Sequence, residues 1–122
     1  MNNTILNDFL AFKARKKDLI STYGDDLHNV EVSPIIVKAS DVVLAIDKYT
    51  ANEIDMPMLL DWVNTIWFTD LYEYMDNETD SISSVLDVLE TLDEDGVALT
   101  KDDFADMKNS LLNNQEYIMT AK

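Results

Sequence analysis

The 122-residue sequence has no cysteine, one histidine, two glycines and two prolines. The lack of cysteine excludes disulfides, iron–sulfur clusters and thiolate zinc sites. The single histidine, His28, excludes an ordinary site with several histidine ligands. Because three acidic residues lie close to it in sequence, we interpret His28 as a surface or hydrogen-bonded residue rather than a catalytic base. The scarcity of glycine and proline argues against a loop-rich or all-β protein.

Long apolar runs are also missing. No uncharged apolar segment approaches the roughly 20 residues that a membrane-spanning helix needs. Residues 1–17 lack a basic segment followed by a clean apolar run, so we expect no signal peptide. We therefore expect a cytoplasmic protein that has no membrane partner.

The chain is nevertheless rich in apolar and acidic residues. Apolar residues make up 47% of it, too many for a disordered chain, and its length suits one domain with its own core. The net charge is −15, of which residues 1–50 carry −1 and residues 51–122 carry −14. Such a field repels nucleic acid and anionic membranes and attracts a basic protein. Solubility alone is the more general explanation of this acidity.

Residues 56–76 form the segment around which we expect the chain to fold. Asp55 can cap a helix here, and Pro57 falls in the first turn, where its missing N–H costs nothing. Apolar residues cover well over a third of the helix circumference, as in a helix buried at the centre of a protein. One polar stripe remains on this helix, formed by Asp61, Thr65, Thr69, Tyr72, Glu73 and Asp76.

Apolar side chains at helical spacing predict four further helices. They cover residues 4–23 (ending at Gly24), 33–50 (beginning at Ser33-Pro34), about 80–92, and a last segment that begins at Thr100. The β-branched residues after Pro34 also suit a strand, but they do not alternate strictly with polar ones, and we assign them to the helix. We therefore predict an all-α bundle of about five helices around the central one at 56–76, with residues 1–122 as a single domain.

The loop before the last predicted helix resembles a calcium-binding EF-hand loop. Asp93, Asp95, Gly96 and Asp102 fall at the third, fifth, sixth and last loop positions. Thr91 replaces the first aspartate ligand, however, and the usual bidentate glutamate is also missing. The end of one helix followed by the cap of the next explains the same residues, and a calcium-responsive module remains an alternative.

No catalytic motif is present. The many carboxylates guarantee chance neighbours, and the chain has neither a nucleophile elbow nor a glycine-rich phosphate loop. We therefore expect no enzymatic activity, no metal and no cofactor.

Basic residues cluster in the first predicted helix, at Lys13, Arg15, Lys16 and Lys17. The simplest expectation is that they pair with the acidic second half of the same molecule. A separate anionic ligand is the alternative.

Residues 70–80 combine two tyrosines with five acidic residues. Tyrosine rings supply contact area in protein interfaces, while carboxylates steer and pair with a basic partner. We predict a partner-binding edge made of Asp61, Asp70, Tyr72, Glu73, Asp76, Glu78 and Asp80. The alternative is that Tyr74 belongs to the core and that the acidic residues form a solvated helix end.

Residues 33–76 and 84–103 resemble the small acidic helical immunity proteins that neutralise bacterial contact-dependent or polymorphic toxins. The similarity to the four-helix immunity proteins of nuclease colicins is looser. Their tyrosine–tyrosine–proline signature is absent, because Tyr72 and Tyr74 are separated by Glu73 and no proline follows.

The resemblance implies a cytoplasmic, non-enzymatic inhibitor that binds a cognate toxin and occludes its active or substrate-binding surface. A nuclease toxin would offer a basic groove that is complementary to an acidic bundle. An acidic inhibitor of the phage or antitoxin type, which mimics nucleic acid, is the alternative with the same charge.

Overall fold

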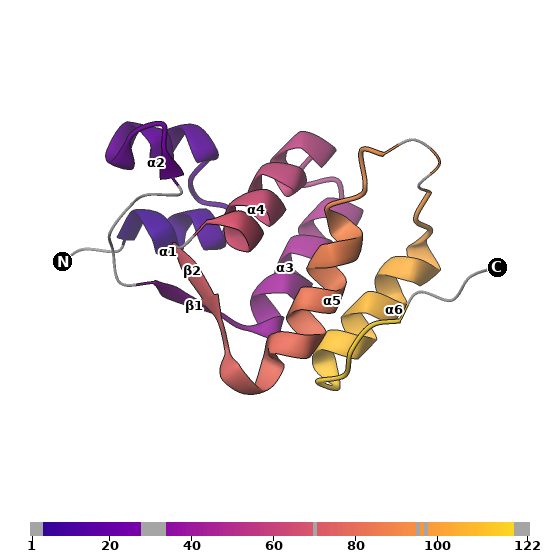
Figure 1. The fold of residues 1–122 in the computed structure, drawn as a ribbon. Helices are drawn as coiled ribbons and strands as arrows, with labels where there is room; N and C mark the ends of the chain where they lie inside the picture. The colour runs from indigo at the N-terminus through magenta and orange to yellow at the C-terminus, as the bar shows by residue number, and fades with distance from the viewer. Residues whose placement is uncertain (1–3, 28–33, 70, 95, 97, 119–122) are drawn as a thin grey trace.

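The computed structural model describes residues 4–27, 34–69, 71–94, 96 and 98–118. Its elements, in chain order, are α1 (Thr4–Leu10), α2 (Lys16–Tyr23), β1 (Ile35–Val37), α3 (Ala39–Thr50), α4 (Met56–Phe68), β2 (Tyr72–Tyr74), the short 3₁₀ helix η2 (Asp76–Glu78), α5 (Thr79–Leu89) and α6 (Lys101–Leu112) (Figure 1). The protein is therefore mainly helical, as the sequence predicts, but it also contains a small parallel sheet.

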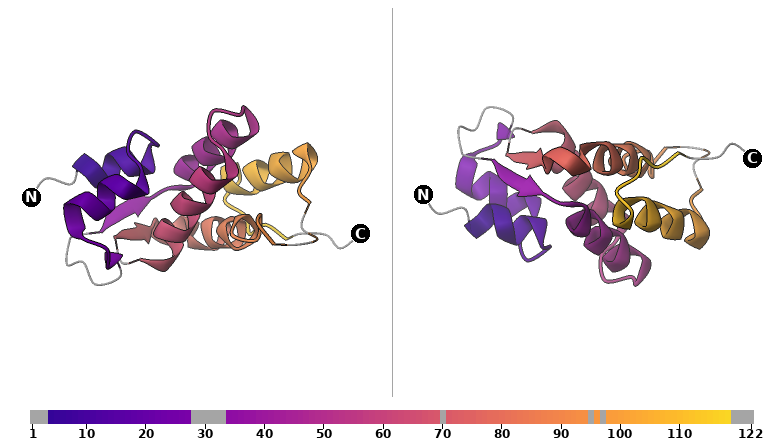
Figure 2. Two further views of the ribbon diagram at one scale, coloured as in Figure 1. Left: turned by 90° about the horizontal axis from the view of Figure 1, so that it is seen from above. Right: turned by 90° about the horizontal axis from the view of Figure 1, so that it is seen from below.

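The helices are arranged along the length of the molecule. Helices α1 and α2 lie at one end with the sheet, α6 lies at the other end, and α3, α4 and α5 lie between them (Figures 1 and 2). Helix α3 packs against α4, α5 and most extensively against α6.

Helix α4 is central, as its apolar circumference predicts, but it is shorter than predicted. The predicted cap is confirmed, because Asp55 Oδ1 accepts a hydrogen bond from the Met58 N–H at 3.0 Å. Buried Leu59, Trp62, Val63 and Ile66 join this helix to one continuous core. Each such side chain contributes about 1.5–3 kcal/mol through removal of apolar surface from water.

The prediction that this helix continues to residue 76 is wrong, because α4 ends at Phe68. Thr69 has an extended backbone, with φ −113° and ψ 164°. Its hydroxyl donates to the Thr65 carbonyl at 2.6 Å and accepts from the Leu71 N–H at 3.3 Å. It therefore satisfies two backbone groups at the end of the helix. The polar stripe expected from residue 61 to residue 76 is therefore not one helix face.

The chain after α4 forms strand β2, which pairs with β1 in parallel. Ile35 lies opposite Tyr72, Ile36 opposite Glu73, and Val37 opposite Tyr74. The predicted helix 33–50 is accordingly correct only for α3, and residues 35–37 form a strand. The local spacing of apolar residues could not predict this strand, because its partner strand lies 37 residues further along the chain.

The predicted helix 4–23 is two helices. Between them Phe12 has a positive φ of 64°, and its ring stacks on Trp62 with the centroids 5.3 Å apart. The break thus brings an aromatic side chain onto the central helix. The predicted end of α2 is confirmed at Gly24, which has a φ of 90°.

Three helices carry as their third residue an aspartate whose carboxylate accepts a hydrogen bond from the backbone N–H just before the helix. The pairs are Arg15 N–H with Asp18 at 2.7 Å, Lys38 N–H with Asp41 at 2.8 Å, and Thr100 N–H with Asp103 at 2.8 Å. The helix dipole also favours negative charge at these positions. The predicted start of α6 after Thr100 is confirmed.

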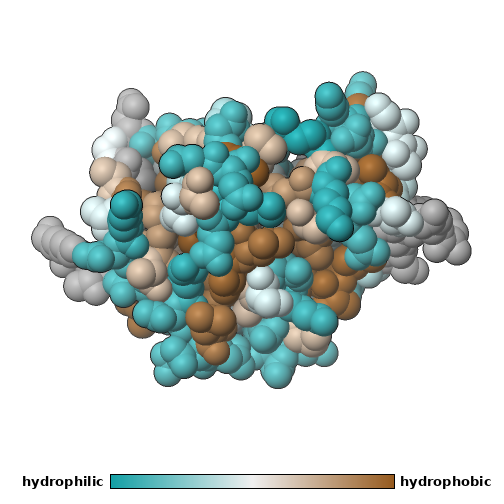
Figure 3. Space-filling model, turned by 180° about the vertical axis from the view of Figure 1, so that it is seen from behind, coloured by the Kyte–Doolittle hydropathy of each residue, from teal (hydrophilic) through white to brown (hydrophobic). Residues whose placement is uncertain are grey.

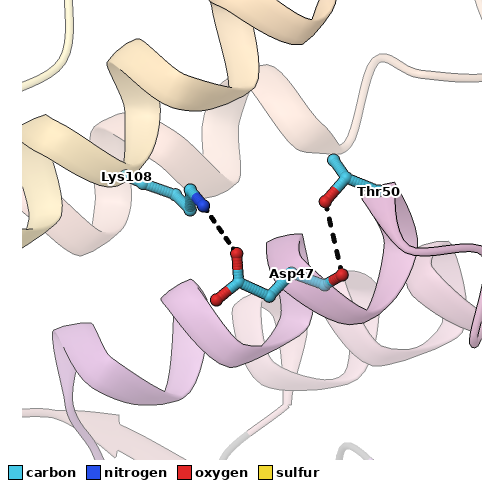
Figure 4. A network of polar contacts seen from close by, with 3 residues as sticks. All are labelled: Asp47, Thr50 and Lys108. Carbon is cyan, nitrogen blue, oxygen red and sulfur yellow. Dashed lines mark hydrogen bonds and ion pairs between the residues drawn. The ribbon is translucent and has the colours of Figure 1, made fainter.

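Helices α3 and α6 are joined across the surface as well as in the core. Lys108 Nζ lies 2.7 Å from Asp47 Oδ1, and the Thr50 hydroxyl donates to the Asp47 carbonyl at 3.3 Å (Figure 4). Beneath them Tyr49 meets Phe104 edge to face. Because the ion pair is partly exposed, we attribute the packing of these helices mainly to the core.

Two buried hydrogen bonds attach α1 to the rest of the protein. The Tyr72 hydroxyl donates to the Leu6 carbonyl at 2.7 Å, and Trp62 Nε1 donates to the Leu10 carbonyl at 3.1 Å. The Tyr72 ring also lies 6.3 Å from the Phe9 ring. Tyr72 is therefore part of the core, with 5% of its surface exposed.

We predict that Tyr72→Phe lowers the free energy of unfolding by about 0.5–1.5 kcal/mol, the net value of a typical hydrogen bond. Urea unfolding at neutral pH measures this change. Tyr49→Phe is the matched control, because none of the described residues accepts a hydrogen bond from the Tyr49 hydroxyl. Equal losses in both variants would contradict the structural role of the Tyr72 bond.

Candidate functional site

A groove of about 440 Å³ lies where α4, β2 and α5 meet. Its lining comes from the end of α4 and the residue after it (Ile66, Trp67, Thr69), from β2 (Tyr72, Glu73, Tyr74) and from the approach to α5 (Asp76, Thr79). Three residues of the predicted binding edge, Tyr72, Glu73 and Asp76, are thus brought together here.

The strand determines which side chains reach the groove and which reach the core. Neighbouring residues of a strand point to opposite faces. Tyr72 points inward and is buried, Glu73 points outward and is exposed, and Tyr74 is partly buried. Asp76 follows in η2 and is exposed.

The carboxylates of the groove have no counter-charge within the described part of the chain. The ion pairs there join Lys48 to Glu53 and Lys108 to Asp47, away from the groove. Glu73 and Asp76 therefore leave their negative charge available to an incoming cation.

The two tyrosines of β2 are neutral hydrogen-bonding groups over the physiological range. Burial raises the pKa of the Tyr74 hydroxyl to about 12. Burial, with a smaller contribution from Tyr23, raises the pKa of Tyr72 far above its ordinary value. Neither phenol can act as a base near neutral pH.

The remaining predicted edge residues do not join this groove. Asp61 lies on α4 beside Phe12, Arg15 and Trp62, around a small hollow at the junction of α1 and α2. Asp70 lies outside the described residues. The prediction of one edge running from residue 61 to residue 80 therefore needs correction, because α4 ends before residue 70.

Two further corrections concern residues whose side chains are engaged within the fold. Glu78 Oε1 accepts a hydrogen bond from the Ala39 N–H at 3.1 Å, so it helps to cap α3. The Tyr72 hydroxyl is bonded to α1, so only part of this residue lines the groove. Asp80 is exposed in the first turn of α5.

Two aromatic side chains at the end of α4 are exposed, which the sequence did not predict. Phe68 is 50% exposed and Trp67 is partly exposed. Their ring centroids lie 6.2 Å apart. Phe68 falls outside the repeating apolar positions of the central helix, and this position in the sequence could have indicated its exposure.

A second acidic groove, also of about 440 Å³, lies between α6 and the segment that follows it. Asp102, Asp103, Asp106 and Glu116 contribute its acidic groups. Burial, followed by the charges of Asp103 and Asp106, raises the pKa of Tyr117 there. The binding-edge prediction contains none of these residues.

Large apolar side chains are exposed at only a few described positions. They are Ile36, Leu44, Phe68, Leu112 and Ile118. On the face turned away from the viewer in Figure 1, hydrophobic residues are interspersed with hydrophilic ones (Figure 3). Of these side chains, Phe68 lines a hollow separate from the first groove, and Ile118 lines the groove described at α6.

The basic cluster does not pair with the acidic half within the described ranges. Lys13, Arg15, Lys16 and Lys17 take part in neither of the two ion pairs found there. Lys16 instead lines a separate hollow with Phe68 and Thr65. The Thr65 hydroxyl is buried and has no hydrogen-bond partner among the described residues.

The described residues show no cluster of three acidic or histidine side chains placed to hold a metal ion. Asp95, from the predicted calcium loop, and His28 lie outside these residues. Within the same ranges, no helix combines the length and the apolar character that crossing a membrane requires.

Comparisons of the chain with protein-family models, with curated proteins and with solved structures find no match. We therefore infer function from the groove, its charge and its aromatic side chains.

We predict that stability falls as the pH rises above about 10. The unfolded chain ionises its tyrosines near pH 10, whereas folded Tyr74 ionises at about 12. A raised pKa in the folded state means that the stabilisation is complete below the unfolded pKa and is lost as the pH rises through the folded one. Urea unfolding at a series of alkaline pH values should show a shallower fall for Tyr74→Phe than for wild type. An identical fall in both proteins would contradict the assignment.

Proposed function

We propose that this protein is a cytoplasmic immunity protein, which binds a basic toxin domain and occludes its active or substrate-binding surface. The observation that carries the proposal is the groove beside β2. It combines two exposed carboxylates that lack counter-charges among the described residues, Glu73 and Asp76, with the partly exposed rings of Trp67 and Tyr74.

The chemistry of this groove suits a protein partner. Aromatic side chains dominate the energetic centres of protein interfaces, because they bury a large area at a small cost in side-chain entropy. Unpaired carboxylates at the margin increase the rate of encounter with a cationic surface and disfavour wrong partners. Rings beside acids therefore provide both affinity and selection for a basic partner.

The charge of the whole molecule acts in the same direction. A net charge of −15 disfavours direct binding to nucleic acid, since phosphates would be repelled. A toxin that acts on nucleic acid needs a basic surface for its substrate, and an acidic protein competes for that surface. This complementarity supports a nuclease as the class of toxin.

A second candidate function is mimicry of nucleic acid towards several basic proteins. The second acidic groove at α6 favours it, because acidic side chains then line two separate surfaces. A mimic should bind unrelated basic proteins and lose all of them as salt rises, whereas an immunity protein should retain one partner at moderate salt.

We predict that affinity capture of the tagged protein from its native host recovers one stoichiometric basic protein, identified by mass spectrometry. Reversal of the groove charges in the double variant Glu73→Lys with Asp76→Lys should weaken binding about tenfold or more at low salt, mostly through slower association. Binding kinetics with the captured partner measure the effect.

The matched control is the double variant Asp106→Lys with Glu116→Lys. It changes the net charge by the same amount, and both residues are exposed at the second groove. Binding lost in the control and kept in the first variant would move the interface to α6. Many basic partners that all dissociate with salt would support mimicry, and an empty eluate would contradict both functions.

A further inference from the structure

The two-stranded sheet leaves one edge of β2 without hydrogen-bond partners from the part of the chain that the structure describes. The Ile35 N–H donates to the Leu71 carbonyl at 3.1 Å, and the Met75 N–H donates to the Val37 carbonyl at 2.9 Å. Backbone groups of alternate residues point to opposite edges of a strand, so those of Tyr72 and Tyr74 point away from β1. No other described backbone or side-chain group hydrogen-bonds to these backbone groups.

The groove lies along this strand. Tyr72, Glu73 and Tyr74 line it from β2, and Trp67 and Thr79 line it from the neighbouring helices. Space of about 440 Å³ is therefore open beside the strand. An exposed edge of this kind is a template for pairing with another chain.

We propose that the partner binds by adding an extended segment to this edge of β2 as a third strand. The segment carries Lys or Arg at alternate positions, with apolar side chains between them. This inference rests on the proposed function and specifies how the partner is recognised.

The side-chain pattern follows from the two faces of the sheet. Glu73 is exposed on the outer face, so a cation at the adjacent position of the added strand would pair with it. Asp76 extends the negative charge beyond the end of β2. The alternate side chains of the added strand would enter the groove beside Trp67 and Tyr74, where apolar groups gain most from burial.

A second copy of this chain fits the edge less well. Pairing two β2 strands would bring Glu73 carboxylates together and join two molecules that each carry a charge of −15. Like charges on neighbouring strands are destabilising. Glu73 therefore protects the edge from self-association while it selects a basic strand.

The first part of the test measures backbone amide exchange in the free protein by NMR. The amides of Tyr72 and Tyr74 should exchange faster than that of Met75, because the Met75 amide is already bonded to the Val37 carbonyl. Equal protection of the three amides would show that the edge is covered and would overturn the proposal.

The second part adds a short synthetic peptide in which lysine alternates with valine. We expect it to slow exchange of the Tyr72 and Tyr74 amides about tenfold or more at saturation and to leave the Met75 amide nearly unchanged. The Glu73→Lys variant should lose this effect, whereas Asp106→Lys, at the second groove, should retain it.

Two modified peptides separate strand addition from attraction by charge alone. One is N-methylated at every lysine amide and the other at every valine amide. Strand addition requires that one of the pair loses binding and the other keeps it, because alternate amides point to opposite edges. Equal binding of the two peptides, or no slowing at Tyr72 and Tyr74 with millimolar unmodified peptide, would overturn strand addition.

The capture experiment tests the proposed function separately from strand addition. If the Glu73→Lys with Asp76→Lys variant loses the captured partner while the peptide protects neither amide, the function stands and strand addition falls. If capture also fails, both fall.

Discussion

The Tyr72 hydroxyl donates a hydrogen bond to the Leu6 carbonyl inside the core and so joins β2 to α1. Helix α1 has seven residues and is too short to be stable alone in water, so it depends on its docking. With Tyr72 fixed inward, the alternation of the strand directs Glu73 outward and sets the charge of the groove. Trp62, bonded to the Leu10 carbonyl, holds the other end of the same helix.

The acidic residues divide into those that build the fold and those that remain available. Asp18, Asp41 and Asp103 satisfy backbone N–H groups at helix starts, and Glu78 bonds the first residue of α3. A high acidic content is therefore partly a means of beginning helices. What remains at the groove is a small, defined set, which explains how a strongly acidic protein can still present a specific surface.

Local sequence patterns predicted the parts of the fold that local interactions determine. The cores of α3, α4, α5 and α6 follow the apolar period, and the caps at Asp55 and Thr100 follow from their residue types. Local patterns did not predict the sheet, because residues 35–37 and 72–74 form strands only by pairing with each other. The same missing contact explains the errors at the site, since Tyr72 lies on a helix stripe only if α4 continues. Glu73 and Asp76 are exposed, as acidic side chains would be in either conformation.

The parallel pairing of β1 with β2 encloses α3 and α4 within one crossover. Closing so long a loop costs entropy that is recovered only when the intervening helices have packed. We therefore expect the free edge of β2 to form late in folding, after the chain has been made beyond residue 74. Under the proposed strand addition, a nascent or partly unfolded chain would have no strand to offer, and binding would require the completed fold.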